Sequence, residues 1–356
     1  MPAWSWLIPA LAIALLVVAL TLGGGPVVFV LGALALIGAV IASVHHAEVV
    51  AHRVGEPFGT LVLAVAVTVI EASLILSMIV AGGSAQARLP RDTIYAAVMI
   101  ILNGVVGVCL LVGGLRHGLQ SFRVEGSNSG LAALFALATL SLVLPTFTTT
   151  TASGTYSGSQ LAFASIASIA LWAVFVFVQT VRHRDYFLPE IDPANTEVHA
   201  EPPSNRLAWA SFAMLLASLV AVVGLAKILS PAIEHAVVAL GAPKTVIGIA
   251  IAMLVLMPET TAAVRAAQAN RLQTSMNLAV GSALASIGLT IPVVATASVA
   301  LGIPLVLGLD NGKDLVMLAL TFVVSAVTLG TGRTHMMQGA VHVVLFAAFL
   351  FLALVP

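Results

Sequence analysis

Long apolar runs separated by short polar clusters dominate the pattern along the chain. Many runs extend over 18 or more residues with almost no charge, the length that a helix needs to cross a bilayer core of about 30 Å. The predicted fold class is therefore an all-α integral membrane protein. The runs predict about eleven spanning helices, near Trp4–Leu22, Pro26–Val44, Gly59–Ala81, Thr93–Gly114, Gly130–Pro145, Gln160–Val181, Leu207–Leu229, Thr245–Ala266, Thr274–Ala300, Leu315–Leu329 and Met336–Val355.

One polar segment, from Arg182 to Arg206, interrupts this pattern. Its five acidic residues favour a solvated linker between two halves, with weak cation sensing as the alternative. The predicted organisation is a leading helix in residues 1–25, a first five-helix repeat in 26–181, the acidic linker in 182–206 and a second five-helix repeat in 207–356. Because each repeat contains an odd number of spans, the second repeat inserts from the opposite face. Such inverted repeats are typical of secondary transporters, whose sites lie near the membrane midplane.

Composition agrees with a membrane location, since 60% of the residues are hydrophobic and only 8% are charged. A soluble domain carries roughly three times that charged fraction. The formal net charge of zero argues against a nucleic-acid partner. The single cysteine, Cys109, excludes an intrachain disulfide and a thiolate metal cluster. We expect no cofactor; membrane lipid, inorganic cations and protons are the expected partners, and no protein partner is inferred.

The basic residues predict how the chain is oriented. With eleven spans, nine Lys and Arg residues fall in the loops of one face and five in those of the other. The positive-inside rule makes the first face cytoplasmic, which places the N-terminus and the linker inside and the C-terminus outside. The first apolar run lacks the basic n-region of a signal peptide, so we interpret it as a spanning helix.

Two glutamates stand alone inside apolar spans. Glu71 has no ionisable neighbour between Gly59 and Val80, and Glu259 has none before Arg265. Each lies about twelve residues into the second helix of its half. Twelve helical residues extend ~18 Å, which places the carboxylate about halfway across the bilayer. A carboxylate there costs on the order of 3 kcal/mol, so it indicates a functional site. The alternatives are a protonated structural acid for Glu71 and a solvated interfacial acid for Glu259.

Paired carboxylates suit an exchanger because either a cation such as Ca²⁺ or protons can neutralise them, but not both together. When the site is empty and doubly charged, the protein resists the conformational change that exposes the site to the other side of the membrane. With a cation or protons bound, the protein can make this change. Glu71 and Glu259 are the predicted metal ligands. Further oxygens are predicted from the carbonyl that Pro258 would free by breaking its helix, and from Thr68, Thr260, Thr261, Asn103, Asn277, Ser282 and Ser286. The alternative for these small polar side chains is that they only join membrane helices.

Other titratable residues flank the predicted site. The stretch from His45 to His52 predicts an amphipathic helix at the cytoplasmic face, with proton relay by His52 as the alternative. Glu56 lies at the mouth of the Glu71 helix, where it could guide cations inward, although an acid that favours a helix N-terminus is the commoner explanation. We interpret His342, in the last predicted helix, as a hydrogen-bonded structural residue.

In the stretches around Glu71, Glu259 and His342, the sequence resembles the bacterial ChaA-type calcium/proton antiporters, which are related to the CAX exchangers of the calcium/cation antiporter superfamily. The matching stretches are His45–Ile75, Leu256–Val294 and Gly332–Phe349. The resemblance implies eleven helices in two inverted repeats, with essential acids at Glu71 and Glu259. It also implies a multi-pass protein of the bacterial inner membrane that exchanges cytoplasmic Ca²⁺ for external protons. CAX-type repeats carry a Gly-Asn pair where this chain has Val67-Thr68 and Val255-Leu256, so Na⁺ or K⁺ in place of Ca²⁺ is the alternative.

Two other classes of function make different predictions. An intramembrane enzyme needs paired aspartates, a zinc triad or a Gly-x-Ser-x-Gly turn within the spans, and the sequence contains none of these there. We therefore expect a transporter and not an enzyme. A channel would show no fixed ratio between protons and cations, so a transport measurement separates it from an antiporter.

Overall fold

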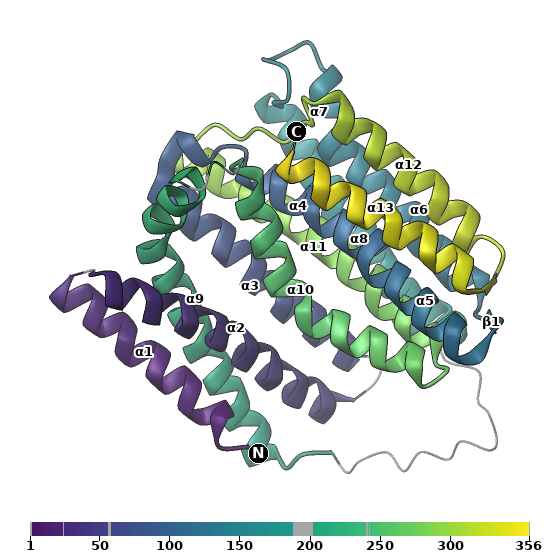
Figure 1. The fold of residues 1–356 in the computed structure, drawn as a ribbon, viewed down its shortest axis with the longest axis horizontal. Coiled ribbons are helices and arrows are strands. Elements are labelled where there is room, and N and C mark those ends of the chain that lie inside the picture. The colour runs from purple at the N-terminus through teal and green to yellow at the C-terminus, as the bar shows by residue number, and fades with distance from the viewer. Residues whose placement is uncertain are drawn as a thin grey trace.

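The structure is a computed structural model that describes residues 2–23, 25–55, 58–187, 202–239, 241 and 243–355. Glu56 and most of the acidic linker, residues 188–201, lie outside the described residues. Within them, eleven segments are long and apolar enough to cross a membrane, which confirms the predicted number. Helices account for almost all of the fold (Figure 1).

The first half of the chain contains six of these spans. They are α1 (Trp4–Leu22), α2 (Pro26–Val54), α3 (Phe58–Gly82), α4 (Leu89–Met99) continued by the π-helical turn η2 (Ile100–Val105) and α5 (Val106–His117), α6 (Val124–Ala138) continued by η3 (Thr139–Val143) and α7 (Leu144–Phe147), and α8 (Gly158–Phe177) continued by η4 (Val178–Arg182). Short 3₁₀ turns, η1 (Gly83–Gln86) and η5 (Arg184–Tyr186), follow α3 and η4.

The second half contributes five spans. They are α9 (Asn205–Ala239), α10 (Thr245–Gln268), α11 (Leu272–Leu301), α12 (Gly312–Leu329) and α13 (Met336–Leu354). With α1 set aside, five spans therefore precede residues 188–201 and five follow them. The order of spans relates α3 to α10, the α4–η2–α5 span to α11, and α8 to α13. This is the expected arrangement of one leading helix and two inverted five-helix repeats.

Several predicted helix features differ from the structure; α9, for example, continues to Ala239 and does not end at the predicted Leu229. The predicted end of the second helix at Val44 is wrong, because α2 continues to Val54 before Gly55 adopts a positive φ of 79°. The charged or polar side chains of Glu48, His52 and Arg53 are exposed on this extension, whereas His46 is buried and interacts with the carbonyl of Ser5 at 2.8 Å. The predicted break at Pro258 is also wrong, because α10 runs through Pro258 without interruption. Proline removes one backbone N–H, and neighbouring helices can hold such a span together.

The spans of the two halves interleave. α2 and α3 both pack against α9, α3 also packs against α11, and α10 packs against α4 and α11. In Figure 1, α1 and α2 lie at one edge of the bundle and α12 at the opposite edge, with α3, α10 and α11 between them. The most deeply buried spans are α4–η2–α5, α11 and α3. A buried polar side chain on these helices is thus shielded from lipid on all sides.

Contacts between connections show that the loops alternate between two faces as predicted. At one face, β1 (Gln120–Ser121) pairs antiparallel with β2 (Arg333–Thr334), which joins the α5–α6 connection to the α12–α13 connection. Gln120 donates to Asn270, between α10 and α11, at 2.9 Å. These loops carry the Arg residues assigned to the cytoplasm. That this face is the cytoplasmic one stays a prediction.

Candidate functional site

Glu71 lies in the interior of the bundle, on α3. Its side chain is only 2% exposed. The hydroxyl of Ser286, on α11, donates a hydrogen bond to Oε2 of Glu71 at 2.5 Å. The second oxygen, Oε1, has no hydrogen-bond partner among the described residues. One predicted acid and one predicted hydroxyl, from opposite halves of the chain, therefore meet directly.

Glu259, on α10, is the second buried acid, with 8% of its side chain exposed. Neither of its carboxylate oxygens has a hydrogen-bond partner in the described part of the chain. α10 packs against α3, the helix that carries Glu71. Buried carboxylates are normally satisfied by donors or by cations, so three oxygens of this pair are available to a proton or a cation.

Hydroxyls near the two acids are oriented mainly toward their own helices. Thr68, one turn before Glu71, donates to the carbonyl of Ala64 at 2.8 Å, and Thr260 donates to that of Leu256 at 2.7 Å. Thr261 donates to the carbonyl of Pro258 at 2.8 Å. Their hydrogens are thus used, whereas oxygen lone pairs are left to accept or coordinate. Ser282 is half-buried on α11, one turn before Ser286 and on the same face.

Two predicted site residues have hydrogen-bond partners other than the two acids. Asn103, in η2, hydrogen-bonds to Thr321 and His342 on α12 and α13. Asn277, near the start of α11, donates to the backbone carbonyl of Phe187 and accepts from Gln273. The Asn277 amide thereby ties α11 to the segment before the linker. Its contacts are those of a structural residue at one end of the bundle.

The residues proposed for cation access lie at the end of α2. His52 is exposed in its last turn, and Glu56 lies outside the described residues. Glu48, one turn before His52, was not predicted as a site residue, yet α2, which carries it, packs against α10, the helix of Glu259. Glu48 lies among histidines and other charged residues, so it does not stand out in the sequence as an isolated acid. Glu48 itself is exposed.

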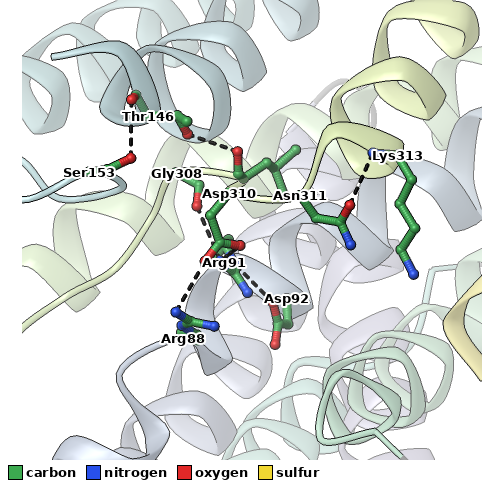
Figure 2. A network of polar contacts seen from close by, with 10 residues as sticks. Arg88, Arg91, Asp92, Thr146, Ser153, Gly308, Asp310, Asn311 and Lys313 are labelled. Atoms are coloured by element: carbon green, nitrogen blue, oxygen red, sulfur yellow. Dashed lines mark hydrogen bonds and ion pairs between the residues drawn. The ribbon is translucent and has the colours of Figure 1, made fainter. Parts of the chain in front are cut away.

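At the other end of the bundle, a network of charges joins the halves (Figure 2). The buried Arg91 guanidinium, at the start of α4, pairs with Asp310 at 2.8 Å and with Asp92 at 2.9 Å, and it donates to the carbonyl of Gly308 at 3.2 Å. Arg88 pairs with the second oxygen of Asp310 at 3.1 Å. Thr146, at the end of α7, donates to the carbonyl of Leu309, so the loop before α12 is held from two sides.

A pocket of about 210 Å³ opens beside this network. Three carboxylates line it, those of Asp92, Asp310 and Asp314, together with three basic side chains, those of Arg88, Arg91 and Lys313. The formal charges balance, so the pocket has no excess of negative charge to attract a cation. We therefore assign the network a structural role.

Replacing Arg91 by methionine should lower the stability of the folded protein by about 1–2 kcal/mol, because the change leaves Asp310 without its better-shielded partner. The Arg91 side chain is 7% exposed, whereas that of Arg88 is 62% exposed. Thermal unfolding in detergent would measure the loss. Arg88→Met is the matched control, with an expected change under about 0.5 kcal/mol. Equal losses for both variants would contradict the structural role of Arg91.

The fold is that of a secondary transporter: two inverted halves, with one buried acid on the second span of each half. A family model described as sodium/calcium exchanger protein matches residues 24–181 and 210–355. The chain belongs to this family and is a membrane exchanger of cations.

Named relatives agree with this assignment. The putative ionic transporter y4hA of Sinorhizobium fredii is 50% identical, over 100% of this chain and 97% of its own length. The sodium-potassium/proton antiporter ChaA of Escherichia coli is 36% identical, over 91% of this chain and 89% of its own. A solved structure of the H⁺/Ca²⁺ exchanger CAX has the same fold, with a TM-score of 0.72 at 15% identity, over 98% of this chain and 87% of the other. These relatives are transporters, in line with the expectation that the chain is not an enzyme.

Proposed function

We propose that the chain is a secondary active antiporter that exchanges cytoplasmic cations for external protons by alternating access, with Glu71 and Glu259 binding either species. The observation that carries this proposal is a pair of buried carboxylates on α3 and α10, three of whose four oxygens have no hydrogen-bond partner among the described residues. A proton on a carboxyl oxygen, or a cation between carboxylates, satisfies such oxygens.

Coupling follows from the electrostatics of the pair. Two unneutralised carboxylates in a low-dielectric interior repel each other and are poorly solvated, so the empty site is costly to carry across the membrane. Loading with a cation or with protons removes that cost. Because both use the same oxygens, one must leave before the other binds. Cation transport in one direction is thereby tied to proton transport in the other.

Ca²⁺ is the first candidate cation, because its double charge balances two carboxylates. It takes six to eight oxygens in proteins, so waters and backbone carbonyls would have to add to Glu71, Glu259 and the hydroxyls of Ser286 and Thr68. Pro258 supplies no N–H to the carbonyl one turn before it, which leaves that oxygen available. Na⁺ and K⁺ are the second candidates, supported by the 36% identity to the Escherichia coli sodium-potassium/proton antiporter.

Transport by the purified protein in proteoliposomes tests this proposal. An imposed proton gradient should drive uptake of Ca²⁺, Na⁺ or K⁺, with each transported cation moving a fixed number of protons. The apparent affinity for the cation should fall as the pH is lowered, because protons compete for the same oxygens. The cation with the highest ratio of maximal rate to half-saturating concentration is the preferred one. Cation flux without proton movement would indicate a channel and overturn the proposal.

A further inference from the structure

Counted from the first residue of each span, Asn103 and Ser286 occupy the same position in the two repeats. Asn103 lies fourteen residues after Leu89, the first residue of α4, and Ser286 lies fourteen residues after Leu272, the first residue of α11. Ser286 donates to the acid of the opposite half, Glu71. The repeat therefore assigns Asn103 to the other acid, Glu259. The structure places the Asn103 amide elsewhere, and both oxygens of Glu259 have no hydrogen-bond partner in the described chain.

Two side chains of the second half hold Asn103 in this position. Its Nδ2 donates to the hydroxyl of Thr321 at 2.8 Å, and that hydroxyl donates onward to the carbonyl of Met317 at 2.7 Å. The amide orientation is thereby fixed, so Oδ1 faces Nδ1 of His342 at 3.2 Å and accepts its hydrogen. Nε2 of His342 then accepts from the hydroxyl of Thr328, also at 3.2 Å.

The imidazole of His342 is enclosed on every side by the described helices. His342, Asn103 and Thr321 are each 0% exposed. A side chain at Gly107, on α5, would place its Cβ 2.8 Å from the Cβ of His342, so glycine is required for this close approach. No charged side chain contacts the ring among the described residues. The ring is satisfied through neutral partners and has no counter-charge, which favours a positioning role over a proton store.

The backbone around Asn103 is suited to a change of position. η2 is a π-helical turn between two α-helices, and such turns contain an extra residue that alters which face of the helix a side chain occupies. His342 bonds to the side chain of Asn103, and η2 packs against α13, the helix that carries His342. Counted in the same way, the position of α8 that corresponds to His342 is Ala164, which has no polar side chain.

We propose that His342 is a positioning residue of the transporter: together with Thr321 it keeps the Asn103 side chain hydrogen-bonded to α12 and α13 and not to Glu259. Release of Asn103 from this contact gives the Glu259 side of the site an additional amide oxygen for a cation. The strength of the contact therefore sets the apparent cation affinity. The inference rests on the proposed function, because it assumes that Glu259 binds the transported cation.

Transport kinetics in proteoliposomes test the inference, with whichever of Ca²⁺, Na⁺ and K⁺ the wild-type protein exchanges. His342→Leu should lower the half-saturating cation concentration roughly fivefold or more, because the freed amide becomes a ligand. The conservative His342→Gln, whose amide can still donate to Asn103, should retain the wild-type value. The effect of His342→Leu should disappear in an Asn103→Ala background, which a merely structural histidine would not produce.

Thr321→Val removes the other tether and should shift the half-saturating concentration in the same direction, which keeps the test available if His342→Leu does not fold. Thr328→Val, which contacts His342 but not Asn103, is the control and should change it by less than about twofold. The inference would be overturned if both His342→Leu and Thr321→Val kept the wild-type half-saturating concentration, or if the shift persisted in the Asn103→Ala background. Neither result would affect the proposed function. A wild-type protein that exchanges no cation for protons would overturn the proposed function and the inference with it.

Discussion

Replacing Glu71 or Glu259 by glutamine should reduce proton-driven cation uptake roughly 100-fold, because each change removes an ionic ligand that contributes on the order of 3 kcal/mol. Glutamine preserves the shape of the side chain but cannot be charged and cannot carry an exchangeable proton in this role. Either variant alone leaves one carboxylate, which cannot balance a divalent cation. Initial rates of uptake into proteoliposomes, compared at equal amounts of reconstituted protein, would measure the loss.

Glu125→Gln is the matched control for these variants. Glu125 is exposed in the first turn of α6, and its replacement should leave transport within about twofold of wild type. A monodisperse profile in detergent and an unchanged thermal transition would show that the glutamine variants at positions 71 and 259 are folded. Wild-type rates in either of the two buried-acid variants would refute the role of that acid.

Replacing Gly339 by valine should destabilise the protein by about 2–3 kcal/mol, the largest effect that we expect on stability. A Cβ at Gly339, on α13, would collide with the backbone of Leu111 on α5. Gly114 of α5 meets the backbone of α13 equally closely near Met336. Close contact of this kind drives helix association within a membrane, where the hydrophobic effect does not favour it. Valine would force the two helices apart.

Thermal unfolding in detergent would measure this change. Gly281→Val is the matched control, because Gly281 also lies inside a spanning helix, α11, and a Cβ there meets nothing within 4 Å. Both variants introduce the same β-branched residue into a helix, so the difference between them isolates the α5–α13 contact. A loss at Gly339 no greater than that at Gly281 would contradict the close packing.

The number of spans and the position of the buried acids could be predicted from the sequence because both depend on local patterns. Uninterrupted apolar runs define the helices, and an acid such as Glu71 is conspicuous where no other charge occurs. Glu48 was missed for the opposite reason, because neighbouring histidines and charges mask it. The extension of α2 to Val54 was missed in the same stretch, since hydropathy reports the apolar part of a helix and not its solvated end.

The orientation of Asn103 could not be predicted, because it depends on partners that are distant in the sequence. Spacing places Asn103 on a spanning helix, but the π-helical turn and the contacts with Thr321 and His342 decide which way it faces. His342 itself looks like an ordinary buried polar residue in sequence. The hydrogen bond between Ser286 and Glu71 likewise joins residues from different halves, and only the relation between the repeats brings them together.

The ion pair between Arg91 and Asp310 has a mechanical consequence for alternating access. Arg91 belongs to the first repeat and Asp310 to the second. Arg91 also donates to the carbonyl of Gly308, in the same loop as Asp310. Separating α4 from the segment before α12 would expose both charges at once. We therefore expect these two parts to move together, so that the motion that opens the site to either face takes place elsewhere in the bundle.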